Sequence, residues 1–408
     1  MSDKYRLLSV EDALDLVLAQ VHPLGAERVP ILRALGRVLA EDVYADTDIP
    51  PLSNSAMDGY ALQAAATLDA TPERPSRLRV IYDLAAGHTT HLDVTSGAAI
   101  RIMTGAPIPS GADTVIPFEE VELDGDWVTI RRPYSVGRNV RPAGEDVRRG
   151  QLVLKEGSVV RPQEVGMLAA LGRREALTIR RPVVGILATG DELLDIDAPL
   201  TPGKIRNANS YSNAAQVLKY GGVPVLLGIA RDEVDEVAER LRDGLGRGVD
   251  LLLTSGGISV GDFDLVKRVL AAEGEMSFWQ VKMRPGKPLA FGQIGGVPLL
   301  GLPGNPVSAM ISFELFARPA ILRMLGKRDL SRTMVEATLA EDIRCRAGFR
   351  HYLRVVLERR DGHYLARLTG DQGSGILLSM VKAQGLAVIS EEETHLRAGA
   401  TVQVMLLT

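Results

Sequence analysis

Between residues 179 and 326, short apolar runs alternate with segments in which apolar residues recur at helical spacing. The runs are continuous rather than alternating with polar residues, which indicates strands buried on both faces of a parallel sheet. The expected strands are Val183–Ala188, Val223–Gly228, Asp250–Leu253, Pro288–Gln293 and Val297–Leu302. The expected helices are Ser210–Tyr220, Glu233–Leu245, Asp264–Glu273 and Ser308–Leu325, the last kinked at Pro319. The pattern predicts a central parallel α/β domain, residues 179–329.

The chain before this domain changes pattern twice. Residues 1–48 are expected to be helical, with Ser9 as the cap of the first helix. Residues 49–147 contain short β-like runs separated by turn residues. Helical spacing then returns in residues 148–178. We therefore predict a β-rich domain, residues 49–147, inserted into a discontinuous helical linker domain made of residues 1–48 and 148–178.

The end of the chain is β-like again. Residues 330–408 are expected to form a small C-terminal β domain, with a hairpin over Tyr352–Leu368 that turns at Asp361-Gly362. A similar hairpin is expected in the inserted domain, over Val121–Ile130. The predicted fold class is therefore a multidomain α/β protein.

Composition narrows the possible functions. The chain has 408 residues, of which 46% are hydrophobic and 24% are charged, as in globular proteins. Its net charge of -4 lacks the basic footprint of a nucleic-acid-binding protein. No apolar run approaches the ~20 residues that cross a bilayer, and the N-terminus does not resemble a signal peptide. With Cys345 as the single cysteine, we expect a cytoplasmic protein without membrane or nucleic-acid partners.

Chemically active residues follow the predicted strands. In open parallel sheets, ligands bind outside the carboxyl ends of the strands. The segments at or beside those ends are Thr189–Glu192, Arg231–Glu233, Thr254–Asp262, Arg284–Lys287 and Leu302–Pro306. Glycines let backbone N–H groups approach an anion, and Arg and Lys neutralise it. Carboxylates beside phosphates suit Mg²⁺, so the pattern indicates cleavage or transfer at a phosphate group.

Each of these segments has a simpler explanation when taken alone. Thr254–Asp262 matches neither a P-loop nor a dinucleotide fingerprint, and a glycine-rich turn is often only a tight turn. Asp191 and Glu192 fit the first turn of a helix, where acids are common. Pro303 and Pro306 suit a turn ahead of the last helix. Their combination favours a ligand site.

The predicted inserted domain carries polar clusters of its own. Asp58 lies among small residues, Thr104 stands at a glycine turn, and Arg141 lies close in sequence to Glu145 and Asp146. A loop rich in turn-forming residues is the alternative explanation for each cluster, and it explains Arg141 better than Asp58.

Several ordered motifs resemble the MoeA family of molybdopterin molybdotransferases, to which the E domain of gephyrin is related. NSAMDGYA, RIMTGAPIP and GLPGNPVSA are the most specific of them. The matching segments are Pro51–Ala61, Arg101–Ile116, Gly144–Val147, Thr189–Leu193, Ser255–Asp264, Arg284–Gly292, Gly301–Ala309 and Gly370–Ser374. They span nearly the whole chain in the family's order.

The resemblance implies a reaction. Members of the family insert molybdenum, supplied as molybdate, into adenylylated molybdopterin, and Mg²⁺-dependent cleavage releases AMP. It also implies an elongated four-domain homodimer with a MogA-like central domain. The family's sites lie in a cleft between this domain of one protomer and the inserted domain of the other. A MogA-type adenylyltransferase and recipient molybdoenzymes are the implied partners.

Roles are carried over by motif. The implied catalytic residues are Asp58, Thr104, Asp146, Glu192 and Asp264. The implied Mg²⁺ ligands are Glu192, Asp232 and Asp264. The implied substrate- and oxyanion-binding residues are Ser255, Gly256, Gly257, Arg284, Lys287, Pro303, Pro306, Arg354 and Ser374.

Departures from the family pattern leave some points open. Gln280 and Arg284 stand where lysine is usual, and Lys204–Ser210 also differs, so the preference between molybdate and tungstate is open.

A MogA-type molybdopterin adenylyltransferase is one alternative function, although it would not need the inserted-domain motifs. A non-catalytic scaffold resembling gephyrin is another, although it would not need the full set of acids.

Overall fold

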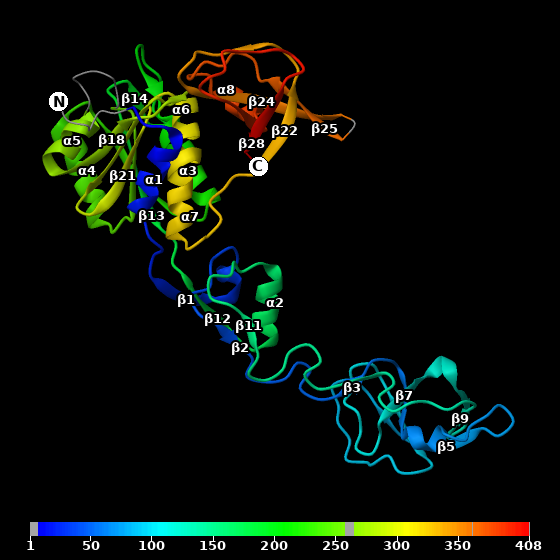
Figure 1. Cartoon of the computed structure of the whole chain (residues 1–408). Coiled ribbons are helices and arrows are strands. Elements are labelled where there is room, and N and C mark those ends of the chain that lie inside the picture. The colour runs from blue at the N-terminus through cyan, green and yellow to red at the C-terminus, as the bar shows by residue number, and fades with distance from the viewer. Residues whose placement is uncertain (1–6, 258–264, 361, 408) are drawn as a thin grey trace. The chain divides into compact units, whose positions relative to one another are not determined.

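The computed structural model describes residues 7–257, 265–360 and 362–407 (Figure 1). The chain forms two compact units, which are described separately. The first unit holds the α/β domain and the C-terminal domain, together with the N-terminal residues up to Arg28 and the segment Gly36–Ala40. The second holds Val29–Leu35 and Glu41–Ala176.

The α/β domain is built on a six-stranded sheet of order β16-β13-β17-β21-β20-β18. Its strands are β13 (Val183–Thr189), β16 (Val223–Ala230), β17 (Leu251–Ser255), β18 (Gly274–Gln280), β20 (Pro288–Ile294) and β21 (Val297–Leu302). The strands β16, β13, β17 and β21 run parallel, as predicted. However, β20 pairs antiparallel with both β21 and β18, so the prediction of a wholly parallel sheet is wrong.

The physical reason is the turn between β20 and β21. Gly295 and Gly296 both have positive φ, at 56° and 78°. Two such residues form the tight turns that join antiparallel neighbours in a hairpin. A parallel connection would have needed a crossover of a dozen or more residues.

The helices of the α/β domain lie close to the predicted ranges. They are α3 (Ala208–Lys219), α4 (Val234–Gly246), α5 (Leu265–Glu273), α6 (Pro306–Ser312) and α7 (Arg318–Met324). The short strands β14 (Leu193–Leu194) and β15 (Ile205–Arg206) precede α3. The irregularity predicted near Pro319 takes the form of a π-helical turn, Phe313–Ala317, between α6 and α7.

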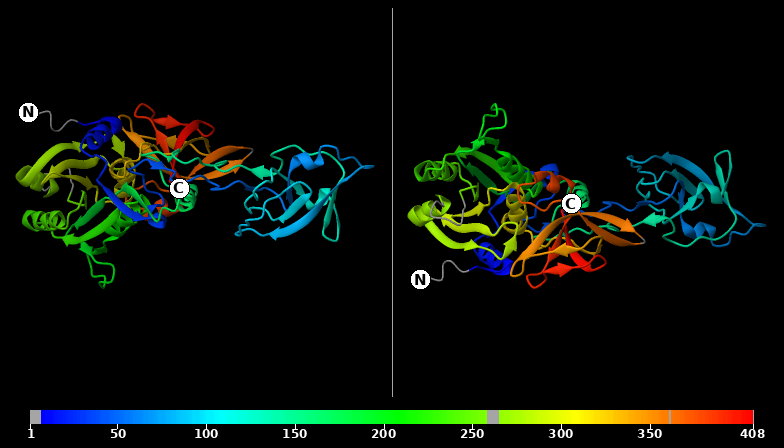
Figure 2. Two further views of the ribbon diagram at one scale, coloured as in Figure 1. Left: turned by 90° about the horizontal axis from the view of Figure 1, so that it is seen from below. Right: turned by 90° about the horizontal axis from the view of Figure 1, so that it is seen from above.

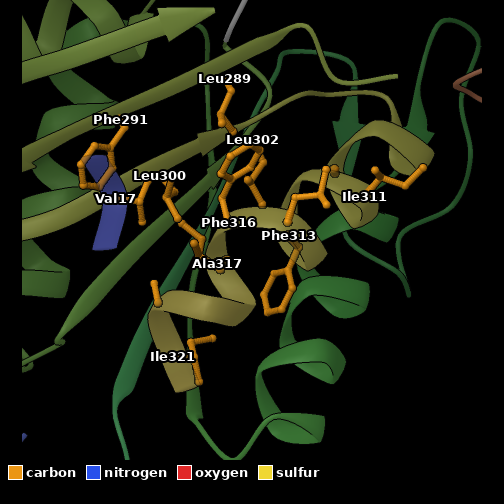
Figure 3. Packing of buried hydrophobic residues seen from close by; sticks show 14 of the residues in the cluster. Val17, Leu289, Phe291, Leu300, Leu302, Ile311, Phe313, Phe316, Ala317 and Ile321 are labelled. Carbon is orange, nitrogen blue, oxygen red and sulfur yellow. The ribbon is translucent and has the colours of Figure 1, made fainter. Parts of the chain in front are cut away.

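The main core lies between the sheet and the helices α6 and α7. Figure 3 shows Leu300 and Leu302 from the sheet beside Phe316 of the π-helical turn, whereas Phe313 points away from the sheet. Leu289, Leu300, Leu302, Phe313 and Phe316 are all fully buried in this cluster. At roughly 2 kcal/mol for each large apolar side chain, this burial is the main stabilisation of the domain.

Helix α1 (Val10–Ala19) belongs to the same core. Its residues Val10, Ala13 and Val17 are buried there, and the helix packs against α7 (Figures 1 and 3). The Ser9 side chain accepts a hydrogen bond from the Asp12 backbone N–H at 3.0 Å, which confirms the predicted cap. The assignment of this helix to the linker domain is therefore wrong, because its apolar face packs on the α/β sheet.

The rest of the predicted linker domain contains strand pairs as well as helices. Strand β1 (Ala26–Pro30) pairs with β12 (Glu175–Ile179), and β2 (Val43–Tyr44) pairs with β11 (Leu152–Leu154). The helices are α2 (Pro162–Ala170) and the 3₁₀ turn Ile31–Ala34. The expectation of a helical linker is wrong because each strand pairs with one from the other half of the segment.

The inserted domain is β-rich, as predicted, and Figure 2 shows its strands in light blue and cyan. Its six-stranded sheet has the order β7-β4-β6-β5-β9-β8. The strands are β4 (Gly59–Leu62), β5 (Ser76–Leu84), β6 (Ala98–Ile102), β7 (Thr114–Pro117), β8 (Glu122–Asp124) and β9 (Trp127–Ile130), and the separate pair is β3 (Asn54–Ser55) with β10 (Val140–Arg141). The antiparallel β8–β9 pair confirms the hairpin predicted over Val121–Ile130.

The C-terminal domain is a small closed barrel. Its sheet order is β19-β24-β25-β22-β28-β26, and an additional β24–β26 pairing closes it. The strands are β22 (Met334–Leu339), β24 (Arg350–Arg360), β25 (His363–Leu368), β26 (Gly385–Ile389) and β28 (Thr401–Leu406), with β23 (Ile343–Arg344), β27 (His395–Leu396) and α8 (Leu377–Lys382) outside the closed ring. Antiparallel β24 and β25 confirm the second predicted hairpin, although Asp361 lies outside the described residues.

One strand joins the barrel to the α/β domain. Strand β19 (Met283–Arg284) pairs parallel with β24, so that Arg284 lies opposite His351. No helix among the described residues is both long and apolar enough to cross a membrane.

Candidate functional site

A small pocket lies at the carboxyl ends of β13, β17 and β21, where the strand topology predicts a ligand. We call it the strand-end pocket. Its volume is about 100 Å³, and its lining comes from the loops after these strands and the start of α3. The lining residues used below are Thr189, Glu192, Asn209, Ser255, Gly256 and Pro306.

Glycine is required in the floor of this pocket. Gly256 has a φ of +87°, and a Cβ on it would lie 2.3 Å from the carbonyl oxygen of Thr189. Gly257 has a φ of +63°, and its Cβ would lie 2.7 Å from Thr189 Oγ1. The hydroxyls of Thr189 and Ser255 are buried, and neither has a hydrogen-bond partner among the described residues. Hydroxyls without a partner beside a glycine backbone suit a phosphate oxygen.

The predicted metal ligands lie in two neighbouring loops. Glu192 is exposed and lines the strand-end pocket. Asp232 is exposed; its carboxylate accepts a long hydrogen bond from the Asp191 backbone N–H at 3.5 Å, and its own N–H donates to the Asp191 carboxylate at 3.3 Å. Asp264 lies outside the described residues, and those residues contain no group of three or more His, Cys, Asp or Glu that would enclose a metal ion.

This donor set fits Mg²⁺ held in a particular way. Mg²⁺ is usually bound by one or two carboxylates together with substrate phosphates and water rather than by a protein cage. Glu192, at the edge of the pocket, supplies one such carboxylate. The described residues therefore fit a substrate-bound Mg²⁺ better than a resident one.

A second and larger pocket lies where the α/β domain meets the barrel. We call it the cationic cleft. Its volume is about 450 Å³. Among the described residues that line it are Arg284, Lys287, Arg344, His351, Arg354 and Ser374, and none of the lining residues is acidic. A cleft of one charge sign concentrates anions.

Arg354 is the most deeply buried cation of the cleft, with no exposed surface. Its Nε donates to Ser379 Oγ at 3.1 Å, and one terminal nitrogen donates to the Gly373 carbonyl at 3.0 Å. The other terminal nitrogen has no hydrogen-bond partner among the described residues. Burial lowers the pKa of Arg354, but an arginine stays charged. The unpartnered N–H groups favour an anion in the cleft.

Arg284 reaches the cleft from the end of β19, and Lys287 from the loop between β19 and β20. Both cations lie over the ring of Phe349, at 5.2 and 5.9 Å from its centre. Cation–π contact of this kind holds a side chain in place without neutralising its charge. The predicted oxyanion ligands Arg284, Lys287 and Arg354 are thus brought together by the fold.

The turn Gly304–Pro306 separates the two pockets. Gly304 and Pro306 line the strand-end pocket, whereas Asn305 lines the cationic cleft. Asn209 donates to the Gly304 carbonyl at 2.7 Å, and Asn305 donates to Ser374 Oγ at 3.0 Å. A ligand that spans this turn would contact both pockets.

Other predicted residues lie elsewhere. Pro303 is buried and is not among the described lining of either pocket. Asp146 is exposed in the inserted domain, where its backbone N–H donates to the Ile49 carbonyl at 3.0 Å. Sequence reasoning missed Arg344 and His351, since neither belongs to a recognisable motif.

Asp58 and Thr104 meet in the inserted domain, although they are far apart in sequence. Asp58 Oδ1 accepts hydrogen bonds from the Thr104 backbone N–H and hydroxyl, both at 2.7 Å. These bonds hold the pKa of Asp58 below its usual range, with the backbone bond as the larger cause. The residue after Asp58 must be a glycine, because a Cβ on Gly59 would lie 2.0 Å from the Ile116 carbonyl oxygen.

Replacement of Thr104 by valine tests this pair. The variant loses the hydroxyl donor but keeps the backbone donor, so the pKa of Asp58 is expected to rise part of the way to that of an ordinary aspartate. The pKa would be measured by carbon NMR of the carboxyl group. A pKa unchanged from the wild type would show that the hydroxyl does not stabilise the carboxylate.

Family models cover most of the chain. They match the MoeA N-terminal region (domain I and II) at residues 8–172, a probable molybdopterin binding domain at 185–323, and the MoeA C-terminal region (domain IV) at 336–407. A curated relative, molybdopterin molybdenumtransferase 2 of Mycobacterium tuberculosis, is 36% identical over 98% of this chain and 100% of its own length. The chain belongs to the MoeA family.

Other relatives agree with this membership of the MoeA family. Molybdopterin molybdenumtransferase of Bacillus subtilis is 34% identical over 100% of this chain and 96% of its own length. A crystal structure of the molybdopterin biosynthesis MoeA protein from Pyrococcus horikoshii matches with a TM-score of 0.87 and 32% identity, over 99% of this chain and 100% of that one. The MoeA fold therefore extends over the whole chain.

Proposed function

We propose that this protein is a molybdopterin molybdotransferase, which transfers molybdenum from molybdate to adenylylated molybdopterin with release of AMP. One observation carries the proposal: a cleft lined by Arg284, Lys287 and Arg354 is separated from a glycine-floored pocket only by the turn Gly304–Pro306. The names of the curated relatives agree with it, because they are molybdopterin molybdenumtransferases.

The cationic cleft is proposed to bind the oxyanion. Molybdate is a dianion without protons to donate, so it needs donors and positive charge around it. Arg354 offers unpartnered N–H groups in a buried setting, and Arg284 and Lys287 add charge from the facing wall. Ser374, which accepts a hydrogen bond from Asn305, lies at the same end of the cleft. The cleft would hold molybdate in place until transfer.

The strand-end pocket is proposed to bind the phosphates of the adenylylated substrate. The backbone at Ser255, Gly256 and Gly257 gives close approach, and the Thr189 hydroxyl is free to donate. Glu192 would hold Mg²⁺ on the substrate phosphates, with Asp232 and Asp264 as further candidates. Mg²⁺ supplies charge neutralisation at the phosphate oxygens when it is bound.

The inserted domain is proposed to contribute Asp58, Thr104 and Asp146. Thr104 fixes the position of the Asp58 carboxylate, which is ionised at neutral pH and available as an acceptor or a metal ligand. A homodimer, a cytoplasmic location and exchange with a MogA-type adenylyltransferase and recipient molybdoenzymes complete the proposal. Their support is the family resemblance.

A single-turnover assay tests the proposed reaction. Purified protein is given adenylylated molybdopterin, Mg²⁺ and molybdate, and AMP release and pterin-bound molybdenum are followed. AMP release by the wild type is expected to need molybdate. Asp58→Ala and Glu192→Ala are each expected to slow it by roughly 10²-fold, as for loss of a group acting on charge in the transition state.

Outcomes of this assay separate the proposed reaction from its alternatives. The variant Asp235→Ala serves as a control. Asp235 is an exposed acid in the first turn of α4, and it is not among the described residues that line either pocket. Intact substrate in the wild type would contradict the transferase. Formation of adenylylated molybdopterin from ATP would favour an adenylyltransferase instead. Full activity of Asp58→Ala and Glu192→Ala would remove both acids from the mechanism.

A further inference from the structure

A buried carboxylate lies in the π-helical turn between α6 and α7. The Glu314 residue is 5% exposed. Its carboxylate accepts hydrogen bonds from Gln216 Nε2 at 2.9 Å and from the Tyr220 hydroxyl at 2.9 and 3.0 Å. Arg332 forms an ion pair with it. Removing a carboxylate from water costs free energy even when all its hydrogen bonds are made. We therefore ask what the partners of Glu314 hold in place.

Those partners hold the segment that connects the α/β domain to the barrel. Arg332 lies in this connection, two residues before β22. Arg318, which is 7% exposed at the start of α7, donates to the carbonyls of Leu330 and Ser331 at 2.9 and 2.6 Å. Both arginines lie over the ring of Tyr220, at 5.4 and 5.2 Å. We call Tyr220, Glu314, Arg318 and Arg332 the linker latch.

The linker latch and the cationic cleft share their supporting elements. The helical stretch that carries Glu314 begins at Pro306, and its residue Ser308 lines the cleft. The connection that the latch holds leads into the barrel, which supplies Arg344, Arg354 and Ser374 to the facing wall. One wall of the cleft therefore comes from the α/β domain, before the connecting segment, and the other from the C-terminal domain, after it. The linker latch fixes the segment between them.

Other contacts between the walls leave a role for the latch. Strand β19 pairs with β24, and Asn305 donates to Ser374 Oγ, both beside the cleft itself. Both contacts are local, whereas the latch fixes the entry to β22. The Val307 N–H also donates to the Ser374 carbonyl at 3.1 Å, and Tyr352, Met380 and Leu386 of the C-terminal domain pack into the main core. Apolar packing is not directional, so it allows small rotations of the barrel about these contacts. A fixed linker restricts that rotation.

We propose that Glu314, through Arg332 and Arg318, is a positioning residue that sets the spacing of the two walls of the cationic cleft and thereby its affinity for an oxyanion. This rests on the proposed function only in taking the cleft as the oxyanion site. In Glu314→Gln the amide keeps the shape but loses the charge, and one acceptor oxygen is replaced by an NH₂ group that faces donors. Arg318 and Arg332 then repel each other without compensation, and the connection loosens.

The test is ligand binding to the full-length protein by calorimetry, with molybdate as the probe of the cleft and AMP as the probe of the strand-end pocket. Glu314→Gln and Arg332→Met are expected to bind molybdate about tenfold more weakly, within the range by which such networks change coupling between sites. AMP affinity is expected to stay at the wild-type value, because the strand-end pocket is lined by the α/β domain alone. Arg332→Lys, which keeps the charge, is expected to retain most of the molybdate affinity.

Arg180→Met is the matched control. Arg180 pairs with the part-buried Asp250, which precedes β17 at the end of the sheet opposite the pockets. This variant also breaks an ion pair, yet it is expected to leave both affinities unchanged. Equal loss of both ligands in the latch variants, or wild-type molybdate affinity in them, would overturn the inference. Absence of molybdate binding in the wild type would instead overturn the proposed function.

Discussion

Replacement of Arg354 by methionine is expected to lower kcat/KM for molybdate by roughly 10²- to 10³-fold, the effect of removing one donor from a pre-formed anion site. Arg354 is fully buried at the junction of the cleft and the barrel, where its charge is weakly screened by water. Methionine is unbranched, apolar and close to arginine in volume, so the variant removes the charge and the donors while it largely fills the same space.

Control variants separate binding from folding. Arg354 also donates to Ser379 and Gly373, so the thermal unfolding of the variant would be followed together with the rate. Arg354→Lys keeps the charge but loses the planar set of donors, and we expect it to recover only part of the activity. Arg359→Met changes an exposed arginine at the far end of the same strand, β24, and should leave the rate unchanged. Wild-type kcat/KM in Arg354→Met would contradict the proposed role.

Replacement of Gly256 by alanine is expected to reduce single-turnover AMP release by about 10²-fold, the effect of a displacement of about 1 Å at a reacting group. The backbone there has a φ of +87°, and the new Cβ would lie 2.3 Å from the Thr189 carbonyl oxygen. No side-chain rotation relieves that contact, because both atoms are fixed to backbone. The ends of β13 and β17 must therefore move apart.

The free energy of unfolding should fall in the same variant. A non-glycine residue held in this conformation costs about 1–3 kcal/mol, to which the contact with Thr189 is added. Gly248→Ala is the control, since Gly248 also has a positive φ, of +72°, but no atom lies within 4 Å of its Cβ position. It should lose stability without losing AMP release. Equal rates for the two alanine variants would show that the Gly256 contact does not shape the pocket.

Local sequence determined the secondary structure of the α/β domain. The strands β13, β16, β17 and β21 and the helix α4 lie within a few residues of the predicted ranges. Both predicted hairpins form. Such elements depend on periodicity and turn residues within a short stretch, which a single sequence displays directly.

Motifs also determined which residues gather at each pocket. Gly256 and Glu192 line the strand-end pocket, while Arg284 and Arg354 line the cationic cleft. A backbone position with positive φ, or one that lies very close to another part of the backbone, accepts only glycine, as at Gly256. Such a glycine is visible in the sequence. The Asp58–Thr104 contact joins two predicted residues, but the hydrogen bonds between them were not predicted.

Tertiary structure alone decided how these pieces are joined. It turned β20 antiparallel, placed α1 in the α/β core, closed the C-terminal barrel and paired β19 with β24. It also brought Arg344 and His351 to the cleft and buried Glu314 against the linker. These outcomes depend on pairing and packing between residues far apart in the chain, and their free energy appears only when both partners are in place.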